Sequence, residues 1–472
     1  MHANPSAFLL ETIMKYYLNC IRGDFLWRLL LITIPITLQT VVFSSKSIVD
    51  TLMLGSLSEY DIAAIGIAGK ALFVVTIFLI GLSLGGAQIA AQYWGSDQSN
   101  KKQKLQQTIL LTWAATTCFA LLAAATFYFF PQAIVASGTN STEVIARGSA
   151  FLQITSINFL FFAYTCSIAV GLRAMHQPSI TMVYSLLGVV LNIFLNWVLI
   201  FGRFGFQPMG IAGAAYGTLI SACVETILLY VHLRWKSHLL SRFPSLVAKA
   251  IRHADIKLLL KLSIPSAINS TLWALGVFVF YAILGSVSVE SLAALSILAP
   301  IESFSLAFLI GLSSAASILV GGSIGANKME EAYDRAWGLV LFSLMVGVVT
   351  CISVWLFKQN ILQMFSSLTP EVRQMTGQFF DIMVVAFIVK SVAMMMVVGV
   401  LRPGGEAKFC LYLDFFSQWV LLLPLAAYLR YGLGIDPIYI YGLLLVEEAI
   451  KVVIAYRRIK SRKWLNNFVC PA

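Results

Sequence analysis

The sequence predicts an all-α polytopic membrane protein, with twelve transmembrane helices in two pseudo-symmetric six-helix lobes. Of its 472 residues, 59% are hydrophobic and only 11% are charged, and the mean hydropathy is +0.86. Soluble proteins have about 45–50% apolar and about 25% charged residues, and disordered chains are less hydrophobic still. The chain also divides into apolar segments long enough to cross a bilayer, and its second half repeats the first. These three observations exclude an ordinary soluble protein.

The apolar segments set the expected domain organisation. One bilayer crossing takes about 20 apolar residues, and the breaks between segments are short and polar, except for a longer basic connection at 234–257. We expect a lead-in at 1–24, an N-lobe at 25–233, this linker, a C-lobe at 258–456 and a basic tail at 457–472. The expected spans are 25–54, 63–93, 105–130, 147–172, 178–202, 210–233, 258–285, 292–322, 333–357, 376–401, 408–430 and 437–456.

The net charge of +11 comes from Lys and Arg that lie mostly between the apolar segments. Cytoplasmic loops of membrane proteins carry such an excess, whereas a nucleic-acid-binding protein gathers it on a folded basic face. With both termini placed inside, the inner side receives 23 of the 32 Lys and Arg, the outer side five and the spans four. We therefore expect a multi-pass protein of the cell's inner (plasma) membrane, with both termini cytoplasmic and no nucleic-acid partner.

The seven cysteines and five histidines show no pattern of a disulfide framework or a metal site. The cysteines are widely spaced without a Cys-x-x-Cys pair, and cysteine in apolar surroundings behaves as a small hydrophobic residue. No histidine lies deep in an apolar segment. We expect a monomer in the lipid bilayer that holds no metal and no cofactor.

An internal repeat gives the strongest signal of organisation. At a constant shift of 230 residues, the second half of the chain matches the first. The matched pairs include Pro35 with Pro265, Ile80-Gly-Leu-Ser83 with Ile310-Gly-Leu-Ser313, and Gly95 with Gly325. Since each copy has an even number of spans, both copies face the same way, about a pseudo-twofold axis along the membrane normal. Two such lobes suit alternating access, in which they rock about a site between them.

Three motifs then identify a family. They are Ile34-Pro-Ile-Thr-Leu-Gln-Thr with Ile48-Val-Asp-Thr-Leu-Met-Leu-Gly55, Asn192-Ile-Phe-Leu-Asn-Trp-Val-Leu-Ile-Phe-Gly, and Gly399-Val-Leu-Arg-Pro-Gly-Gly-Glu-Ala-Lys-Phe. Together with the repeat, they make the chain resemble the multidrug and toxic compound extrusion (MATE) family from about residue 25 to residue 460. The resemblance implies a secondary antiporter that exports small organic, often cationic, compounds against inward H⁺ or Na⁺.

The resemblance places a cation-coupling site in the N-lobe. Asp50 matches the acidic position of the family's first span, and a structural pair with Lys46, one turn earlier, is the alternative. Asn192 and Asn196 match polar positions that line the family's N-lobe cavity. Their amide oxygens could bind Na⁺ or a protonated carboxyl, and interhelical hydrogen bonding is the alternative. Pro35 leaves an unpaired carbonyl and a bend, which would let the first span flex during transport.

The C-lobe departs from the family's best-known sodium-linked branch. The glutamate of that branch in the seventh span is replaced here by Trp273, which puts its cation site in doubt. Charges inside the bilayer cost at least about 2.5–3.5 kcal/mol and are usually paired or functional. Lys390 could therefore pair with Glu302 or Asp414, or Glu302 could carry a second proton or face a cationic substrate. The expected substrate-binding residues are Glu302, Trp273, Tyr281, Lys390 and Asp414.

Two other acids of the spans receive different interpretations. Glu447 lies four residues before Lys451, a spacing that favours a structural ion pair on one helix. Glu225 is isolated in the sixth span, and its role stays open. Gly81 and Gly311 are expected to permit close helix packing.

Two other functions compete with drug export. A flippase for lipid-linked precursors would need a cationic cleft for phosphate, which Lys46, Lys70 and Lys390 keep open as an alternative. An intramembrane transferase would need clustered His or Asp or a metal set, which the sequence lacks, so we do not expect an enzyme. The loss of the familiar C-lobe carboxylates and the retention of Asp50 favour H⁺ over Na⁺ as the coupling ion.

Overall fold

The structure is a computed structural model that describes residues 17, 19, 21–54, 58–241, 250–286, 289–364 and 369–469. Side chains at positions 47, 48, 50, 51, 52, 54, 289, 290, 292, 361 and 364 also lie outside the description. The backbone of Asp50 therefore belongs to a described helix, but its side chain does not belong to the described part. Most of the predicted lead-in, the linker residues 242–249 and the tail residues 470–472 lie outside it as well.

The first half of the described chain forms α-helices and one short 3₁₀-helix. They are α2 (Asp24–Leu54), α3 (Glu59–Gly95), α4 (Lys101–Phe129), α5 (Pro131–Ala136), α6 (Thr142–Ser156), α7 (Asn158–Ala174), α8 (Pro178–Phe201), α9 (Gly210–Trp235) and η1 (Leu239–Ser241). The second half combines α-helices with three π-helices. They are α11 (His253–Gly285), α12 (Val289–Gly325), α13 (Met329–Leu356), α14 (Lys358–Met364), α15 (Pro370–Met394), η2 (Met395–Leu401), α16 (Ala407–Phe415), η3 (Phe416–Leu422), α17 (Leu423–Ala427), η4 (Tyr428–Gly432) and α18 (Pro437–Lys460).

These helices confirm the predicted fold class. Among the described residues, ten helical stretches are long and apolar enough to cross a membrane. The pair α6 and α7, bent by 42°, is apolar enough when taken together and makes an eleventh if the two helices are one broken span; the sequence predicts one helix at 147–172. The predicted twelfth span, at 437–456, falls on α18, which has 24 residues and carries three buried charges, Glu447, Glu448 and Lys451. It is not among the stretches that are apolar enough by themselves.

Local sequence signals explain where several helices begin and end. Pro178, Pro370 and Pro437 occupy the first turns of α8, α15 and α18, where the missing N–H of proline costs no hydrogen bond. Asp436 caps α18, since its carboxylate accepts a 2.8 Å hydrogen bond from the Ile438 N–H. The helices are therefore delimited largely by short-range chemistry.

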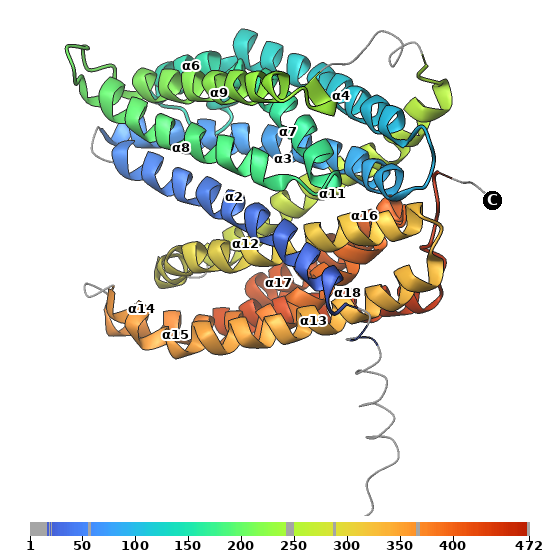
Figure 1. The fold of residues 1–472 in the computed structure, drawn as a ribbon. Helices are drawn as coiled ribbons and strands as arrows, with labels where there is room; N and C mark the ends of the chain where they lie inside the picture. The colour runs from blue at the N-terminus through green and yellow to red at the C-terminus, as the bar shows by residue number, and fades with distance from the viewer. Residues whose placement is uncertain are drawn as a thin grey trace, which may run out of the picture. The chain divides into compact units, whose positions relative to one another are not determined.

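By its contacts the chain divides into two units. Unit 2 holds residues 38–90 and 98–271. Within it α8 packs along α9, α4 packs against α7, and α6 packs against α9, the group coloured cyan to green in Figure 1. Its apolar core is formed by buried side chains from α3, α4, α5, α6, α7, α8 and α9.

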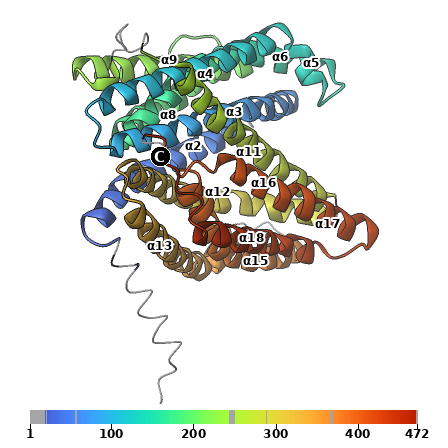
Figure 2. The same cartoon turned by 90° about the vertical axis from the view of Figure 1, so that its right-hand side faces the viewer.

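Unit 1 holds residues 1–37, 91–97 and 272–472. Helix α15 packs against α12, α13 and α18, and Figure 2 shows α13, α15 and α18 side by side. The π-helices η2 and η3 pack against α12 and α18 respectively. The bounds of the two units differ from those of the predicted lobes in the first part of α2, the end of α3 and the first part of α11.

One packing contact occurs twice and reflects the internal repeat. A Cβ on Gly81 would lie 2.6 Å from the Ala267 Cα, and a Cβ on Gly311 would lie 2.1 Å from the Thr37 Oγ1. Gly81 and Thr37, shifted by the predicted offset of 230, become Gly311 and Ala267. The predicted close packing at both glycines is thus confirmed, and the two contacts are equivalent under the repeat, each joining a glycine of one copy to a residue of the other.

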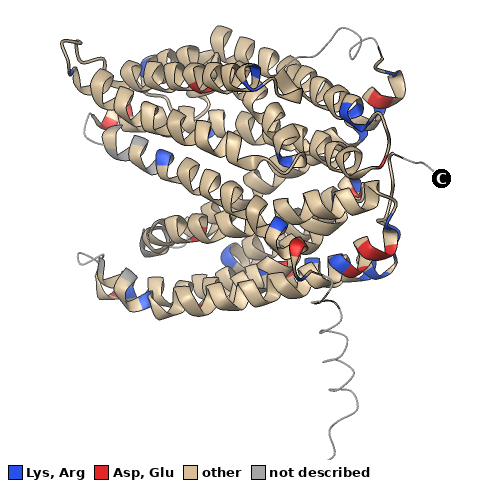
Figure 3. Ribbon diagram, viewed as in Figure 1, with Lys and Arg blue, Asp and Glu red and all other residues tan. Residues whose placement is uncertain are grey.

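The charged residues follow the pattern expected of a membrane protein. Figure 3 shows few Lys, Arg, Asp and Glu along the middle of the described helices and more of them at the helix ends. The last turn of α18 alone carries Arg457, Arg458 and Lys460. The charges that do lie inside helices are therefore informative.

Candidate functional site

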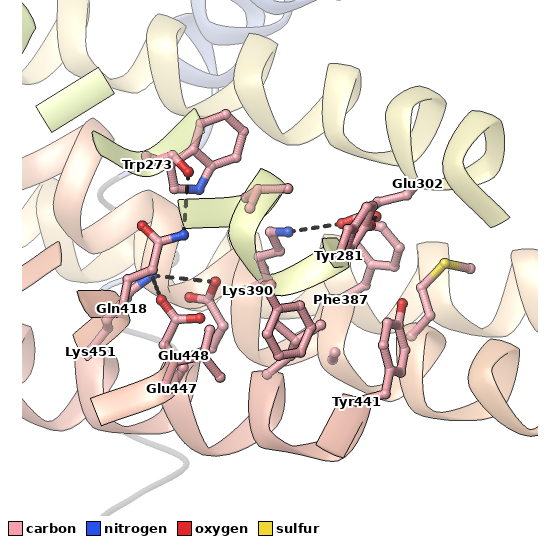
Figure 4. Close-up of a pocket in the computed structure, with 16 residues that line it drawn as sticks. Trp273, Tyr281, Glu302, Phe387, Lys390, Gln418, Tyr441, Glu447, Glu448 and Lys451 are labelled. Carbon is pink, nitrogen blue, oxygen red and sulfur yellow. Dashed lines mark hydrogen bonds and ion pairs between the residues drawn. The ribbon is translucent and has the colours of Figure 1, made fainter. Parts of the chain in front are cut away.

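A cavity in unit 1 brings most of the predicted substrate-binding residues together. Its volume is about 50 Å³, enough for a few water molecules and well below the roughly 300 Å³ of a small-ligand pocket. Figure 4 shows its charged and aromatic side chains converging from α11, α12, α15 and α18. The lining residues are Trp273, Val277, Phe280, Tyr281, Glu302, Met383, Ala386, Phe387, Lys390, Gln418, Leu422, Tyr441, Leu444, Glu447, Glu448 and Lys451.

Glu302 is held by two partners on one side of the cavity. Its carboxylate lies 3.2 Å from the Lys390 Nζ and accepts a 2.5 Å hydrogen bond from the Tyr281 hydroxyl. The three side chains come from α12, α15 and α11, so the group joins three helices of unit 1. The predicted Glu302–Lys390 pair is therefore present.

Lys451 is the centre of a second group. Its Nζ lies 2.7 Å from Glu447, 3.7 Å from Glu448 and 3.9 Å from Asp414, and only 6% of Lys451 is exposed. The i,i+4 pair with Glu447 confirms the spacing argument. Asp414 joins Lys451 and not Lys390, because α16 packs against α18.

The two groups leave the cavity with an excess of acid. Three carboxylates line the cavity, those of Glu302, Glu447 and Glu448, and Asp414, which does not line it, lies beside Lys451. These four carboxylates face two ammonium groups. If all of them are ionised, two negative charges stay uncompensated in an apolar setting, where an unpaired charge is costly. The arrangement therefore favours the uptake of positive charge, either as protons on carboxyl groups or as a cation.

The π-helix η3 supplies the polar edge of the cavity. The Gln418 amide donates a 3.3 Å hydrogen bond to the Trp273 carbonyl, and the Trp419 indole donates one of 3.1 Å to the Leu272 carbonyl. A Cβ on Gly276 would lie 2.3 Å from the Gln418 side chain, so the glycine gives Gln418 its place. These contacts set the position of Trp273 against the cavity.

The sequence reasoning missed several members of this site. Phe387, Gln418, Tyr441 and Glu448 line the cavity but were not predicted as site residues, and Glu447 and Lys451 were interpreted as a structural pair only. One signal could have found those on α18, since Tyr441, Glu448 and Lys451 recur at the three- and seven-residue spacings of one helical face.

The predicted N-lobe amides lie at the contact between α8 and α9. Asn192 and Asn196 are 0% and 1% exposed, and the Asn192 amide donates a 3.3 Å hydrogen bond to the Thr218 hydroxyl. A Cβ on Gly217 would lie 2.3 Å from the Asn196 Oδ1. These contacts fit the interhelical role that the sequence leaves open. The side chain of their predicted partner Asp50 lies outside the described residues.

Glu225 is connected to other buried groups and is not isolated. The Arg173 guanidinium donates to the Gln39 amide oxygen at 2.8 Å, the Gln39 amide donates to the Ser185 hydroxyl at 2.9 Å, and that hydroxyl donates to Glu225 at 3.0 Å. Lys46 also interacts electrostatically with Glu225. Hydrogen bonds thus connect the positive Arg173 to the negative Glu225 through side chains of α7, α2, α8 and α9. Gln39 lies four residues after Pro35, the proline inside α2.

Known proteins match this chain over most of its length. The curated relatives include the uncharacterized transporter YisQ of Bacillus subtilis, 25% identical over 94% of this chain and 96% of its own. The probable multidrug resistance protein NorM of Thermotoga maritima is 25% identical over 84% of each chain. The multidrug resistance protein MdtK of Yersinia enterocolitica is 25% identical over 84% of this chain and 86% of its own.

Solved structures show the same fold. A MATE crystal structure in complex with MaL6 superposes with a TM-score of 0.84 at 16% identity, covering 94% of this chain and 99% of the other. The outward-facing structure of a multidrug resistance MATE family transporter of the MOP superfamily gives a TM-score of 0.82 at 16% identity, covering 94% and 98%.

The MatE family model matches the chain twice, at residues 35–198 and 265–428. The two matches start and end 230 residues apart, which is the offset of the internal repeat. With both copies matched over more than half of the chain, this protein belongs to the MatE family of multidrug and toxic compound extrusion transporters.

Proposed function

We propose that this multi-pass membrane transporter is a secondary antiporter that exports organic, often cationic, compounds by alternating access, driven by inward H⁺ or Na⁺. The observation that carries the proposal is the acid excess of the unit 1 cavity beside an aromatic wall. Carboxylates without enough counter-charge attract a cation, and aromatic faces bind the cation and its apolar frame. The names of the relatives NorM and MdtK support drugs as substrates.

In this proposal Glu302, Trp273, Tyr281, Lys390 and Asp414 bind the substrate. An incoming organic cation would take the place of Lys390 or Lys451 beside the carboxylates. The cavity of about 50 Å³ is too small for a drug, so a larger substrate requires a second conformation in which the site is wider. Affinity that differs between two conformations is what allows a gradient to drive export.

The coupling site is proposed in the N-lobe, with Asp50 as the carboxylate, Asn192 and Asn196 as its hydrogen-bonding partners, and Pro35 as the bend. H⁺ is favoured over Na⁺ because the carboxylates of the sodium-linked branch are missing from the C-lobe, where Trp273 stands in place of its glutamate, whereas Asp50 is retained. The protein is proposed to act as a monomer in the plasma membrane, without a cofactor and with both termini cytoplasmic.

The test is transport in proteoliposomes under an imposed pH or Na⁺ gradient, with ethidium as substrate. Wild-type protein should accumulate ethidium against its gradient, and Asp50→Asn, which mimics the protonated acid, should abolish accumulation while the protein still folds. Asp381→Asn is the matched control, because Asp381 pairs with Lys358 at an exposed position. Asp50→Asn vesicles that accumulate ethidium at a near wild-type rate would move the coupling to Glu302 or Asp414.

The competing functions receive less support from the described residues. A lipid-linked precursor carries phosphate, which the acid excess of the cavity repels, although Lys390 and Lys451 lie there. Vesicles that translocate a fluorescent lipid-linked precursor but no ethidium would favour the flippase. An intramembrane transferase would turn over its substrate chemically, which mass spectrometry of the vesicle contents would detect.

A further inference from the structure

The segment that follows α18 belongs to unit 1 and is docked against other elements of that unit by many specific contacts. Trp464 is fully buried at 0% exposure, and its indole donates a 3.1 Å hydrogen bond to the Ile459 carbonyl. Val469 is also buried, at 9% exposure. A C-terminal segment without specific contacts would leave its tryptophan exposed, so this segment packs at a defined place on the protein.

Gln92, near the end of α3, holds the middle of that segment. Its amide donates to the carbonyls of Pro403 at 2.8 Å and Asn466 at 2.9 Å, and its Oε1 accepts a 2.8 Å hydrogen bond from the Phe468 N–H. Gln92 is 0% exposed. One buried amide therefore ties α3, the connection after η2, and the C-terminal segment together.

Two asparagines of the segment bind backbone carbonyls of other elements. The Asn466 amide donates to the Gly404 carbonyl at 2.8 Å, and the Asn467 amide donates to the Ile324 carbonyl, near the end of α12, at 3.0 Å. Ion pairs join the same region to its surroundings, with Arg458 on Glu406 at 2.7 Å and Arg462 on Glu330.

The glycines of the Pro403-Gly-Gly-Glu406 motif make room for the segment. A Cβ on Gly404 would lie 2.0 Å from the Trp464 carbonyl oxygen, and a Cβ on Gly405 would lie 2.4 Å from the Phe468 ring. The proposed transport cycle assigns no role to this motif. Its glycines are explained by the close approach of the C-terminal segment.

Beneath the segment, α3 and α12 cross backbone to backbone. A Cβ on Gly325 would lie 1.9 Å from the Gln92 carbonyl oxygen, and a Cβ on Gly95 would lie 2.2 Å from the Gly322 carbonyl oxygen. Gly95 and Gly325 are a matched pair of the repeat, so the crossing joins equivalent ends of the two copies. Helix α3 runs through unit 2 up to Ala90 and belongs to unit 1 from Ala91 onward.

We propose that residues 464–469 form a clasp that binds across the ends of α3 and α12 and holds this glycine crossing closed. The inference rests on the proposed alternating access, because the helix ends at one membrane face must separate for the substrate site to open there. In the proposed orientation this is the cytoplasmic face. The clasp must release in each cycle, so its strength sets how readily the transporter opens inward.

The test measures amide hydrogen exchange of the full-length protein in detergent, in segments 91–97 and 319–327. Asn466→Ala removes the bond to Gly404, and Gly404→Ala displaces the segment without changing it. Each should raise the exchange rate of both segments by about three- to tenfold, because a net hydrogen bond of this kind shifts an opening equilibrium by roughly that factor. Lys463→Ala is the control for the first variant, because Lys463 is exposed. Gly442→Ala is the control for the second, because nothing lies within 4 Å of its added Cβ.

Equal exchange in the two variants and the two controls overturns the clasp. If a variant also raises the exchange rate of α8, that variant causes general unfolding. The comparison of Asn466→Ala with Lys463→Ala, a change at an exposed tail residue, then decides whether the clasp exists. The readout needs no transport. If the variants raise the exchange rates but the protein does not export ethidium, the clasp stands and the proposed antiporter is refuted. If the protein exports ethidium but the variants leave the exchange rates unchanged, the antiporter stands and the clasp is refuted.

Discussion

At the residue scale, the proposed function makes Glu302 and Lys390 the pair that sets the affinity of the unit 1 cavity for a cation. Lys390 lies 3.2 Å from the carboxylate, so in that proposal it competes with a cationic substrate for Glu302. Lys390→Met should therefore tighten ethidium binding, and Glu302→Gln should weaken it, each by about tenfold for a change of about 1.4 kcal/mol. Fluorescence titration of the purified protein measures both affinities.

Lys358→Met is the matched control for that experiment, since Lys358 pairs with Asp381 outside the cavity. Its affinity should equal that of the wild type. If Lys390→Met and Glu302→Gln shift the affinity in the same direction, the two side chains act as a structural pair and not as competitors for the substrate.

A second residue-scale prediction concerns the chain of hydrogen bonds that ends on Glu225. Glu225→Ala removes the acceptor of the Ser185 hydroxyl, and a buried polar group left unpaired costs about 1–3 kcal/mol. Glu225→Gln keeps an oxygen acceptor and should cost less. Thermal unfolding in detergent compares the two variants, and equal losses would show that the hydrogen bond to Ser185 contributes nothing to stability.

At the element scale, His238 joins the end of α9 to the turn between α7 and α8. Its Nε2 lies 3.0 Å from the Gln177 Oε1, and its Nδ1 accepts a hydrogen bond from the Leu240 N–H at 3.2 Å. Only the neutral ring can donate at one nitrogen and accept at the other. Partial burial, and secondarily His232, hold the pKa of His238 below its ordinary value.

The lowered pKa of His238 predicts that the folded protein becomes less stable in acid. The unfolded chain binds a proton at His238 near pH 6.5, whereas the folded protein binds it only at lower pH, so folding is disfavoured as the pH falls through that range. The melting temperature of the wild type should drop relative to that of His238→Gln between about pH 7.5 and 5.5. A constant difference across this range would contradict the assignment of the neutral ring.

At the scale of the whole molecule, the charge asymmetry predicts where the termini lie. The last turn of α18 carries three basic residues, and such clusters stay on the cytoplasmic side. Cysteines introduced at residues 3 and 468 of a cysteine-free variant should resist a membrane-impermeant thiol reagent in intact cells and react after permeabilisation. A cysteine at Thr139, in the predicted outer loop between 130 and 147, is the control that should react in intact cells.

Some contacts of the structure follow from the sequence, and others do not. The i,i+4 pair of Glu447 and Lys451 follows from helical spacing alone, and the close packing at Gly81 follows from a glycine inside an apolar span. The Glu302–Lys390 pair was one of two open choices, because the partners are 88 residues apart and nothing local selects between them. The bonding of Glu225 was missed because its partners come from three other helices.

The sequence by itself determined the membrane class, the twelve spans, the parallel repeat and the family, because hydropathy, helix length and periodic similarity are properties of the chain taken in order. The tertiary structure decided which charges meet, where Asp414 finds its counter-charge, and why Gly404 and Gly405 stand after η2. These depend on which helical faces pack together, and packing joins residues that no sequence spacing relates.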